Sequence, residues 1–183
     1  MKYLIRHAHK ENSKVHSKLS QKGITDSRNY GMSLKKNNIK ISKIVTSPII
    51  RCVETANHIK ETYGDLEVLE STLLGNPGVF ISDSEKAMNV FEKYNLVDII
   101  NMQLSNNAIE GFKNINIAIN ELKKFILNES DNTLFISHDA IITPFIYSLY
   151  NKVNILESDI VKYLDGFKIS NEKDTLYTNS FRL

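Results

Sequence analysis

The sequence has little cysteine, no long apolar run and no excess of charge of either sign. Cys52 is the only cysteine, which rules out a disulfide within the chain and fits a reducing compartment. No stretch approaches the ~20 apolar residues needed to span a bilayer. The start, Met1 and Lys2, precedes only three apolar residues, too few for the apolar core of a signal peptide. We therefore expect a cytoplasmic protein.

The charge balance and the length are those of an ordinary globular domain. Lys and Arg number 23 against 21 Asp and Glu, a net charge of +2, which makes no case for nucleic-acid or membrane partners. A chain of 183 residues is enough for one domain that buries about two-thirds of its unfolded-state surface. We expect residues 1–183 to form a single domain. Its oligomeric state is not indicated by the sequence.

Short apolar runs alternate with amphipathic stretches along the chain. The apolar runs at 3–5 and 133–137 predict buried strands, as in a parallel sheet, and 44–46 and 66–69 are predicted as two further strands. Helices are predicted over 20–36, 47–59, 84–94, 112–126 and 140–150. The tail, 160–183, predicts one or two strands around a turn at 171–174. This alternation predicts an α/β fold, with a mostly parallel central sheet and helices on both faces. Residues 95–107 are either helical or irregular, and 75–107 form a possible small insertion or lid over the active face.

Charged and imidazole side chains follow three of the predicted elements. Arg6 and His7 come directly after the first strand, and His138 and Asp139 follow the strand at 133–137. Arg51 falls in the first turn of the helix after the second strand. Because ligands of open α/β sheets bind outside the carboxyl ends of the strands, we expect these five side chains to converge.

That helix is expected to begin at Ser47 and Pro48, a capping residue followed by proline at the first helical position. Its first turn would then direct backbone N–H groups at an anion. Helix position therefore strengthens the interpretation of Arg51 as an anion ligand rather than a surface charge.

The converging set suits phosphoryl transfer. Arginine side chains bind phosphate oxygens bidentately and stay charged, and a neutral imidazole is a competent nucleophile near pH 7. Arginines and a protonated histidine would offset charge on the equatorial oxygens, so that no metal or other cofactor is required. A carboxylic acid would protonate the departing alkoxide and later take a proton from water.

Four motifs in the same order resemble the histidine phosphatase superfamily, the phosphoglycerate mutase-like group. They are LIRHA (residues 4–8), LSQKG (19–23), TSPIIRCVETA (46–56) and FISHD (135–139). The resemblance implies a three-layer α/β/α sandwich. It implies that His7 is the phosphorylated nucleophile and that Arg6, Arg51 and His138 bind the phosphoryl group. The chain departs from the common pattern at Ala8, often Gly, and at Cys52, often Ala.

The proton donor has two candidates. In the mutase-like branch it is usually a Glu after the second helix, and Glu70 is the best match there. In the acid phosphatase branch it is the Asp directly after the second histidine, where this chain has Asp139. We favour Asp139, because it matches residue for residue, with Glu70 as runner-up. Asp83, in the loop expected to cover the site, is a distant third.

Three other functions compete with a phosphatase. A phosphoglycerate mutase-type phosphotransferase would discharge the same phosphohistidine to a second hydroxyl, but the resemblance associates mutases with longer insertions. A phosphate-binding module without catalysis is a second alternative. A metal-dependent hydrolase using His7 and His9 is a remote third. His9 and Lys10 are otherwise expected at the rim. The substrate would be a phosphorylated small molecule or a phosphoprotein.

Overall fold

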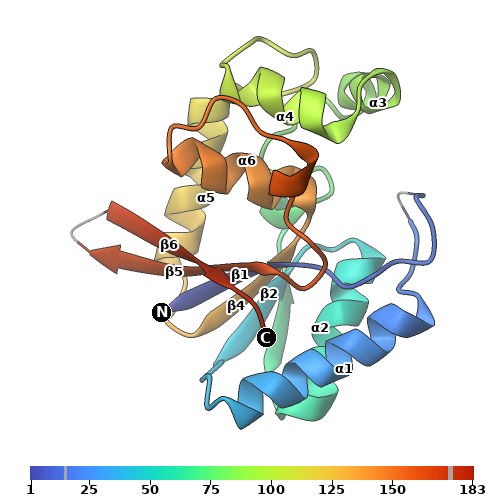
Figure 1. The fold of residues 1–183 in the computed structure, drawn as a ribbon, viewed down its shortest axis with the longest axis vertical. Helices are drawn as coiled ribbons and strands as arrows, with labels where there is room; N and C mark the ends of the chain where they lie inside the picture. Colours follow the sequence, from blue (N-terminus) through green and yellow to red (C-terminus); the bar gives the residue numbers. More distant parts are fainter. Residues whose placement is uncertain (15, 173–174) are drawn as a thin grey trace.

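Six strands form one sheet in the computed structural model, which describes residues 1–14, 16–172 and 175–183 (Figure 1). In chain order they are β1 (Lys2–Arg6), β2 (Lys43–Thr46), β3 (Glu67–Glu70), β4 (Thr133–Ser137), β5 (Gly166–Glu172) and β6 (Thr175–Phe181). Across the sheet the order is β3-β2-β4-β1-β5-β6. The first four pair in parallel, whereas β5 and β6 are antiparallel. The predicted mostly parallel sheet, with two strands in the tail, is confirmed.

Helices cover both faces of this sheet. On one face lie α1 (Gln21–Lys36) and α2 (Ile50–Tyr63), and on the other α5 (Ile115–Asn128) and α6 (Asp139–Leu149) (Figure 1). Farther from the sheet, α4 (Leu96–Leu104) contacts α6, and α3 (Ser84–Lys93) contacts α4. Two 3-10 turns, η1 (Thr72–Leu74) and η2 (Glu157–Asp159), lie in connecting loops. The expected three-layer α/β/α arrangement is therefore confirmed.

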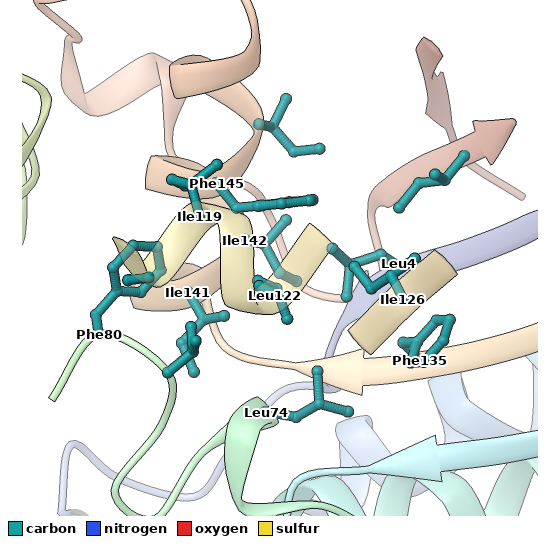
Figure 2. Packing of buried hydrophobic residues seen from close by; sticks show 14 of the residues in the cluster. Leu4, Leu74, Phe80, Ile119, Leu122, Ile126, Phe135, Ile141, Ile142 and Phe145 are labelled. Carbon is teal, nitrogen blue, oxygen red and sulfur yellow. The ribbon is translucent and has the colours of Figure 1, made fainter. Parts of the chain in front are cut away.

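Alternate residues of the central strands enter two separate cores. Facing α5 and α6 are the strand residues Leu4 and Phe135 (Figure 2). Val45 belongs to the same core. Facing α1 and α2 are Ile5, Ile44 and Ile136. Because successive side chains of a strand point to opposite faces, a strand covered on both sides is apolar at every position. This is the physical reason that apolar runs located β1 and β4, whereas β3, at the edge of the sheet, is largely exposed.

Some predicted boundaries are wrong, and the reasons are local. The second helix begins at Ile50 rather than Pro48, and its N-cap residue is Ile49 rather than Ser47, without a capping side chain. Asp83, not Ser84, caps α3, with its carboxylate accepting from the backbone of that helix's first turn. Residues 95–107, left open by the sequence, contain α4. Residues 173 and 174 of the predicted turn lie outside the described residues.

In the described part of the chain, none of the helices combines the length and the apolar character needed to cross a membrane.

Candidate active site

The carboxyl ends of three strands are level with one another, which brings the segments after them together. In the sheet, Arg6 of β1 pairs with Ser137 of β4, and Thr46 of β2 pairs with Ile136 of β4. The next residues continue this alignment, since the His7 N–H donates to the Ser137 carbonyl at 3.0 Å. The side chains expected to converge from three distant motifs therefore start from neighbouring points.

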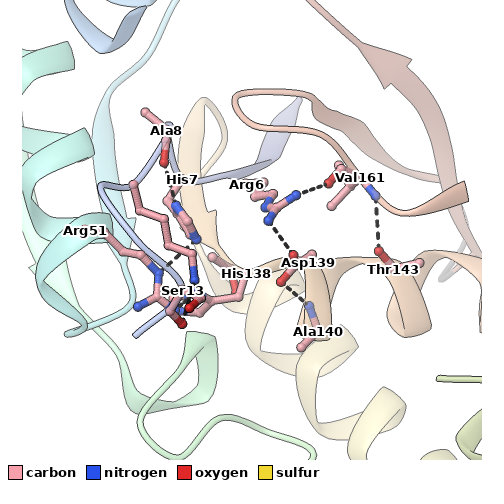
Figure 3. Close-up of polar contacts among 12 residues, drawn as sticks. Arg6, His7, Ala8, Ser13, Arg51, His138, Asp139, Ala140, Thr143 and Val161 are labelled. Atoms are coloured by element: carbon pink, nitrogen blue, oxygen red, sulfur yellow. Dashed lines mark hydrogen bonds and ion pairs between the residues drawn. The ribbon is translucent and has the colours of Figure 1, made fainter. Parts of the chain in front are cut away.

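His7 is 1% exposed and is held in one tautomer. Its Nδ1 lies 2.8 Å from the carbonyl oxygen of Ala8, which can only accept, so Nδ1 carries the proton. The lone pair is therefore on Nε2, which accepts a hydrogen bond from Nε of Arg51 at 2.9 Å (Figure 3). The backbone beyond is also fixed, because the Ala8 N–H donates to Oγ1 of Thr55 at 3.1 Å. The unprotonated Nε2 of His7 therefore points into the cluster.

Arg51 joins the two histidines. Its Nη2 is 3.0 Å from Nδ1 of His138, and because a guanidinium can only donate, that nitrogen accepts. The proton of His138 is then on Nε2, which donates to Oγ of Ser47 at 2.9 Å. Ser47 Oγ also accepts from the Ile49 N–H at 3.2 Å. Ser47, which the sequence suggested as a helix cap, instead orients His138.

Both histidines are neutral near pH 7. Burial lowers the pKa of His7 from 6.5 to about 3; the carbonyl of Ala8 acts in the opposite direction, and the charge of Arg51 adds to the lowering. Burial, followed by Arg51 and His7, lowers the pKa of His138 well below its ordinary value. A neutral His7 agrees with the expected nucleophile. The expected protonated histidine is not supported, so the positive field of this arrangement comes from arginine and lysine.

Arg6 lies on the other side of the cluster and is held by three different contacts. Its Nη2 lies 2.5 Å from Oδ2 of Asp139, and Nη1 donates to the Val161 carbonyl at 2.8 Å (Figure 3). The guanidinium also lies over the ring of Tyr163, 4.1 Å from its centroid. Among the described residues, Nε of Arg6 is buried without a hydrogen-bond partner. An anion in the cluster would supply that partner.

The two favoured proton-donor candidates occupy different surroundings. Asp139 is the first residue of α6, directly after His138, and its Oδ1 accepts from the Ala140 N–H at 2.9 Å. Glu70 is exposed at the end of β3, the edge strand, and within the described chain no contact joins it to the cluster. The carboxylate of Asp83 caps α3. Of the three carboxylates, the structure brings only Asp139 next to the paired histidines and arginines.

Tyr163 is a neighbour of the cluster that the sequence did not indicate. Its ring centroid is 5.6 Å from that of His7 and 5.2 Å from that of His9. It lies in the loop before β5, where one tyrosine among several carries no distinguishing signal. His9, expected at the rim, also bonds through Nδ1 to Oγ of Ser20 at 2.8 Å.

Lys10 adds a third cation near the site, as its expected rim position suggested. Burial lowers the pKa of Lys10. The charges of Arg51 and Arg6 add to this lowering, whereas the carboxylate of Asp139 opposes it. Nζ of Lys10 lies 3.4 Å from the carbonyl oxygen of Ser13.

Gly75 allows the chain after η1 to approach the cluster. A Cβ at this position would lie 2.4 Å from Oγ of Ser47 and 2.7 Å from Nε2 of His138, and φ is +150°. Nearby, the Ser137 hydroxyl donates to the Leu74 carbonyl at 2.8 Å. In the sequence, Gly75, Pro77 and Gly78 predict only a loop. The close approach of Gly75 to Ser47 and His138 depends on the tertiary structure.

Cys52 is fully buried, with Sγ 3.5 Å from Nε2 of His138. Burial raises the pKa of its thiol to about 12, against the lowering effect of Arg51. The thiol is therefore protonated near pH 7 and packs against the histidine rather than acting as a nucleophile.

The described residues contain no group of three or more His, Cys, Asp or Glu side chains arranged to hold a metal ion. His7 and His9 thus have no third donor of that kind beside them, and the metal-dependent alternative gains no support from the donor set.

Residues 2–75 match the family model of the histidine phosphatase superfamily (branch 1). No curated protein sequence matches the chain. The matched segment contains three of the four motifs, including Arg6, His7 and Arg51.

Solved structures match over nearly the whole chain at low sequence identity. Phosphoglycerate mutase from Bacillus anthracis str. Sterne has a TM-score of 0.69 at 19% identity, covering 98% of this chain and 91% of that one. A mutant phosphoserine phosphatase from Entamoeba histolytica in complex with phosphoserine has a TM-score of 0.65 at 18% identity, covering 98% and 95%. The protein histidine phosphatase SixA complexed with tungstate has a TM-score of 0.59 at 14% identity, covering 97% and 93%. The fold is the one these proteins share, and the resemblance to the histidine phosphatase superfamily is confirmed.

Proposed function

We propose that the protein is a phosphatase that hydrolyses a phosphomonoester through a phosphohistidine on His7. The observation that carries the proposal is the unprotonated Nε2 of a neutral, buried His7, which lies 2.9 Å from a guanidinium nitrogen of Arg51. A neutral imidazole next to fixed cations can attack a phosphorus whose oxygens those cations hold.

In the first step, Nε2 of His7 forms a bond to phosphorus while the bond from phosphorus to the ester oxygen breaks. When the substrate binds, Arg51 would donate its hydrogen bonds to the phosphate oxygens instead of to the two histidines. The lone pair on Nε2 of His7 would then be free to attack. Arg6, through its buried Nε, and Lys10 would hold further oxygens. These cations offset the charge on the equatorial oxygens of the transition state. His138 would bind the phosphoryl group beside Arg51.

The ester oxygen leaves as an alcohol only when it receives a proton, and we infer that Asp139 donates it. In the structure Asp139 pairs with Arg6. A phosphate dianion that competes for Arg6 would favour proton uptake by the neighbouring carboxylate, because like charges repel. In the second step, Asp139 takes a proton from water, the resulting hydroxyl group bonds to phosphorus, and the bond from phosphorus to His7 breaks. The proton on Asp139 and the lone pair on His7 are then restored.

We infer that residues 1–183 act as one domain, with the segment 75–107 covering one side of the site. The position of this segment supports its role as a cover, because Asn76, Phe80 and Met88 help to form the wall of a cavity beside Arg51 and His138. A mutase must retain its intermediate and exclude water. Two short helices give less cover than we expect that task to need, which favours hydrolysis over the mutase-type transfer.

Relatives in fold act on different phosphorylated groups. One is described as a protein histidine phosphatase and another as a phosphoserine phosphatase complexed with phosphoserine. These descriptions support a phosphorylated small molecule or a phosphoprotein as substrate, without choosing between them.

The test is a panel of phosphomonoesters assayed with wild-type protein, His7→Ala and a control, His58→Ala. His58 lies on α2 outside the cluster, paired with Glu61. Wild type and the control should release phosphate, whereas His7→Ala should not, and only proteins with His7 should carry an acid-labile phosphoryl group after quenching. Turnover unchanged in His7→Ala would overturn the proposal. Tight phosphate binding without turnover of any ester would favour the non-catalytic module, and activity lost in EDTA would favour the metal-dependent alternative.

A further inference from the structure

A cavity of about 390 Å³ continues from the candidate active site toward α3. Arg51, His138 and Asp139 line one end of it, the end at which phosphate would be held. Its volume is in the range of pockets that enclose small molecules. Since Asp139, the proposed proton donor, lines the cavity together with Arg51, the part of a substrate that extends from the phosphate would enter it.

The far end of this cavity is apolar. Its wall is made by Phe80, Ile81, Met88, Phe91, Phe112 and Ile141. Met88 and Phe91 are 44% and 39% exposed, although both are large apolar side chains one turn apart on the same helix. Phe91 also contacts Phe112, with ring centroids 5.6 Å apart. Apolar surface left open beside polar catalytic groups is typical of a site for the apolar part of a ligand.

This wall is held in place by the backbone. The N–H groups of Ser82 and Asp83 both donate to the Gly111 carbonyl, at 2.9 and 3.1 Å, and Ile81 forms a bridge with Phe112. A Cβ at Gly111 would lie 2.3 Å from the backbone nitrogen of Ala87, so the start of α3 packs directly on this turn. The apolar end therefore exists before any ligand binds.

Charge is unevenly distributed along the cavity. Of the described residues that line it, Arg51 is the one cation, and it belongs to the phosphate end. A leaving group that carried a carboxylate would find no second cation in this lining, only the uncharged polar side chains of Asn76 and Ser84 among apolar ones, and would lie near the carboxylate of Asp139. Burying an unpaired charge in such surroundings is strongly unfavourable. The lining thus selects against an acidic leaving group.

Resting on the proposed function, we propose that the substrate is a small phosphomonoester of an uncharged, apolar alcohol, whose hydrocarbon part fills the space between α3 and Phe112. Burial of that part would hold the ester oxygen next to Asp139 and the phosphorus next to His7. Phosphoglycerate and other acid phosphates would be poor substrates, which also disfavours the mutase-type activity for a reason independent of lid size.

The test compares alkyl phosphates of similar intrinsic reactivity. Benzyl phosphate and hexyl phosphate represent apolar leaving groups, with glycerol 3-phosphate and 3-phosphoglycerate as polar and acidic counterparts. We expect kcat/KM for the apolar esters to exceed that for the polar ones by about tenfold or more. His7→Ala should abolish every one of these activities. Equal kcat/KM across the series, still dependent on His7, would overturn the apolar-substrate inference alone. No His7-dependent hydrolysis of any ester would overturn the proposed function and this inference with it.

Two variants of the wall test the same inference. Phe91→Ser should lower kcat/KM for benzyl phosphate by about tenfold and leave glycerol 3-phosphate nearly unchanged. The matched control is Ile117→Ser, another exposed apolar residue, on α5 and outside the cavity lining. Met88→Lys, at an exposed position that folding tolerates more readily, should shift the preference toward 3-phosphoglycerate by placing a cation near the leaving group. Wall variants that alter all four esters equally, or none of them, would overturn the assignment.

Discussion

Nε of Arg51 lies 2.9 Å from Nε2 of His7 and donates a hydrogen bond to the lone pair of the proposed nucleophile. The same guanidinium donates to His138 through Nη2. The two imidazoles, whose ring centroids are 5.2 Å apart, are thereby joined through one guanidinium. A phosphate that accepts the hydrogen bonds of Arg51 would simultaneously release the nucleophile, which couples substrate binding to activation.

We expect Arg51→Lys to lower kcat by about 10²–10³-fold, because an ammonium group cannot replace a fork that reaches both histidines and two phosphate oxygens. The measurement is steady-state hydrolysis of the best ester from the panel. Arg28→Lys is the matched control, since Arg28 is exposed and pairs with Glu61 away from the site. A kcat for Arg51→Lys within about threefold of wild type would contradict this role.

Stability should fall as the pH is lowered below neutrality, because His7 is buried in its neutral form. Its pKa is about 3 in the folded protein and 6.5 ordinarily, so between these values the unfolded state binds the extra proton. The stabilisation is complete above the ordinary pKa and is lost as the pH falls toward about 3. From about pH 7.5 to about pH 5, His7 alone should reduce the free energy of unfolding by about 2 kcal/mol, and His138 acts in the same direction.

The measurement for this prediction is urea unfolding at several pH values. His7→Ala should show a shallower dependence on pH than wild type, whereas His58→Ala should keep the wild-type dependence. Parallel curves for wild type and His7→Ala would show that the protonation of His7 is not linked to folding.

Asp139→Asn should distinguish the proton-donor candidates. With an alkyl phosphate, whose leaving oxygen needs a proton, we expect kcat to fall by about 10²-fold or more, and with 4-nitrophenyl phosphate, whose leaving group needs none, much less. Glu70→Gln should change neither. If Glu70→Gln instead shows the selective loss with alkyl phosphates, the runner-up is the donor. Asp139→Asn also breaks the pair with Arg6, and the contrast between the two leaving groups separates that effect from proton transfer.

Gly75→Ala should disturb the site through a steric clash. The new Cβ would lie 2.4 Å from Oγ of Ser47 and 2.7 Å from Nε2 of His138, which must then move. Gly64→Ala is a close control, because φ is +142° at Gly64 and +150° at Gly75, but no atom lies within 4 Å of the added Cβ at Gly64. Backbone strain of about 1–3 kcal/mol should affect both. Only Gly75→Ala should also weaken the binding of inorganic phosphate, measured by calorimetry; equal phosphate affinity in the two variants would contradict the clash.

The sequence predicts the strands and the grouping of the site residues correctly, because both depend on local or periodic patterns. Strands buried on both faces are apolar at consecutive positions, so the runs that contain Leu4 and Phe135 could be located without coordinates. Parallel strands end at one edge of a sheet, which is why Arg6, His7, Arg51 and His138 could be expected together. The start of the second helix was mistaken, because the hydroxyl of Ser47 bonds to a histidine 91 residues away rather than to its own helix.

What the sequence by itself determined is the order of the elements, the layered α/β fold and the convergence of Arg6, His7, Arg51 and His138 at one edge of the sheet, all of which follow from patterning and strand direction. The tertiary structure alone decided which carboxylate stands in the cluster: Glu70 is the last residue of an edge strand, whereas Asp139 begins the helix that follows a central strand. It also decided the tautomer of His7, the contribution of Tyr163 and the apolar wall between α3 and Phe112. Each of these depends on contacts between segments far apart in the chain, whose distances no local pattern encodes.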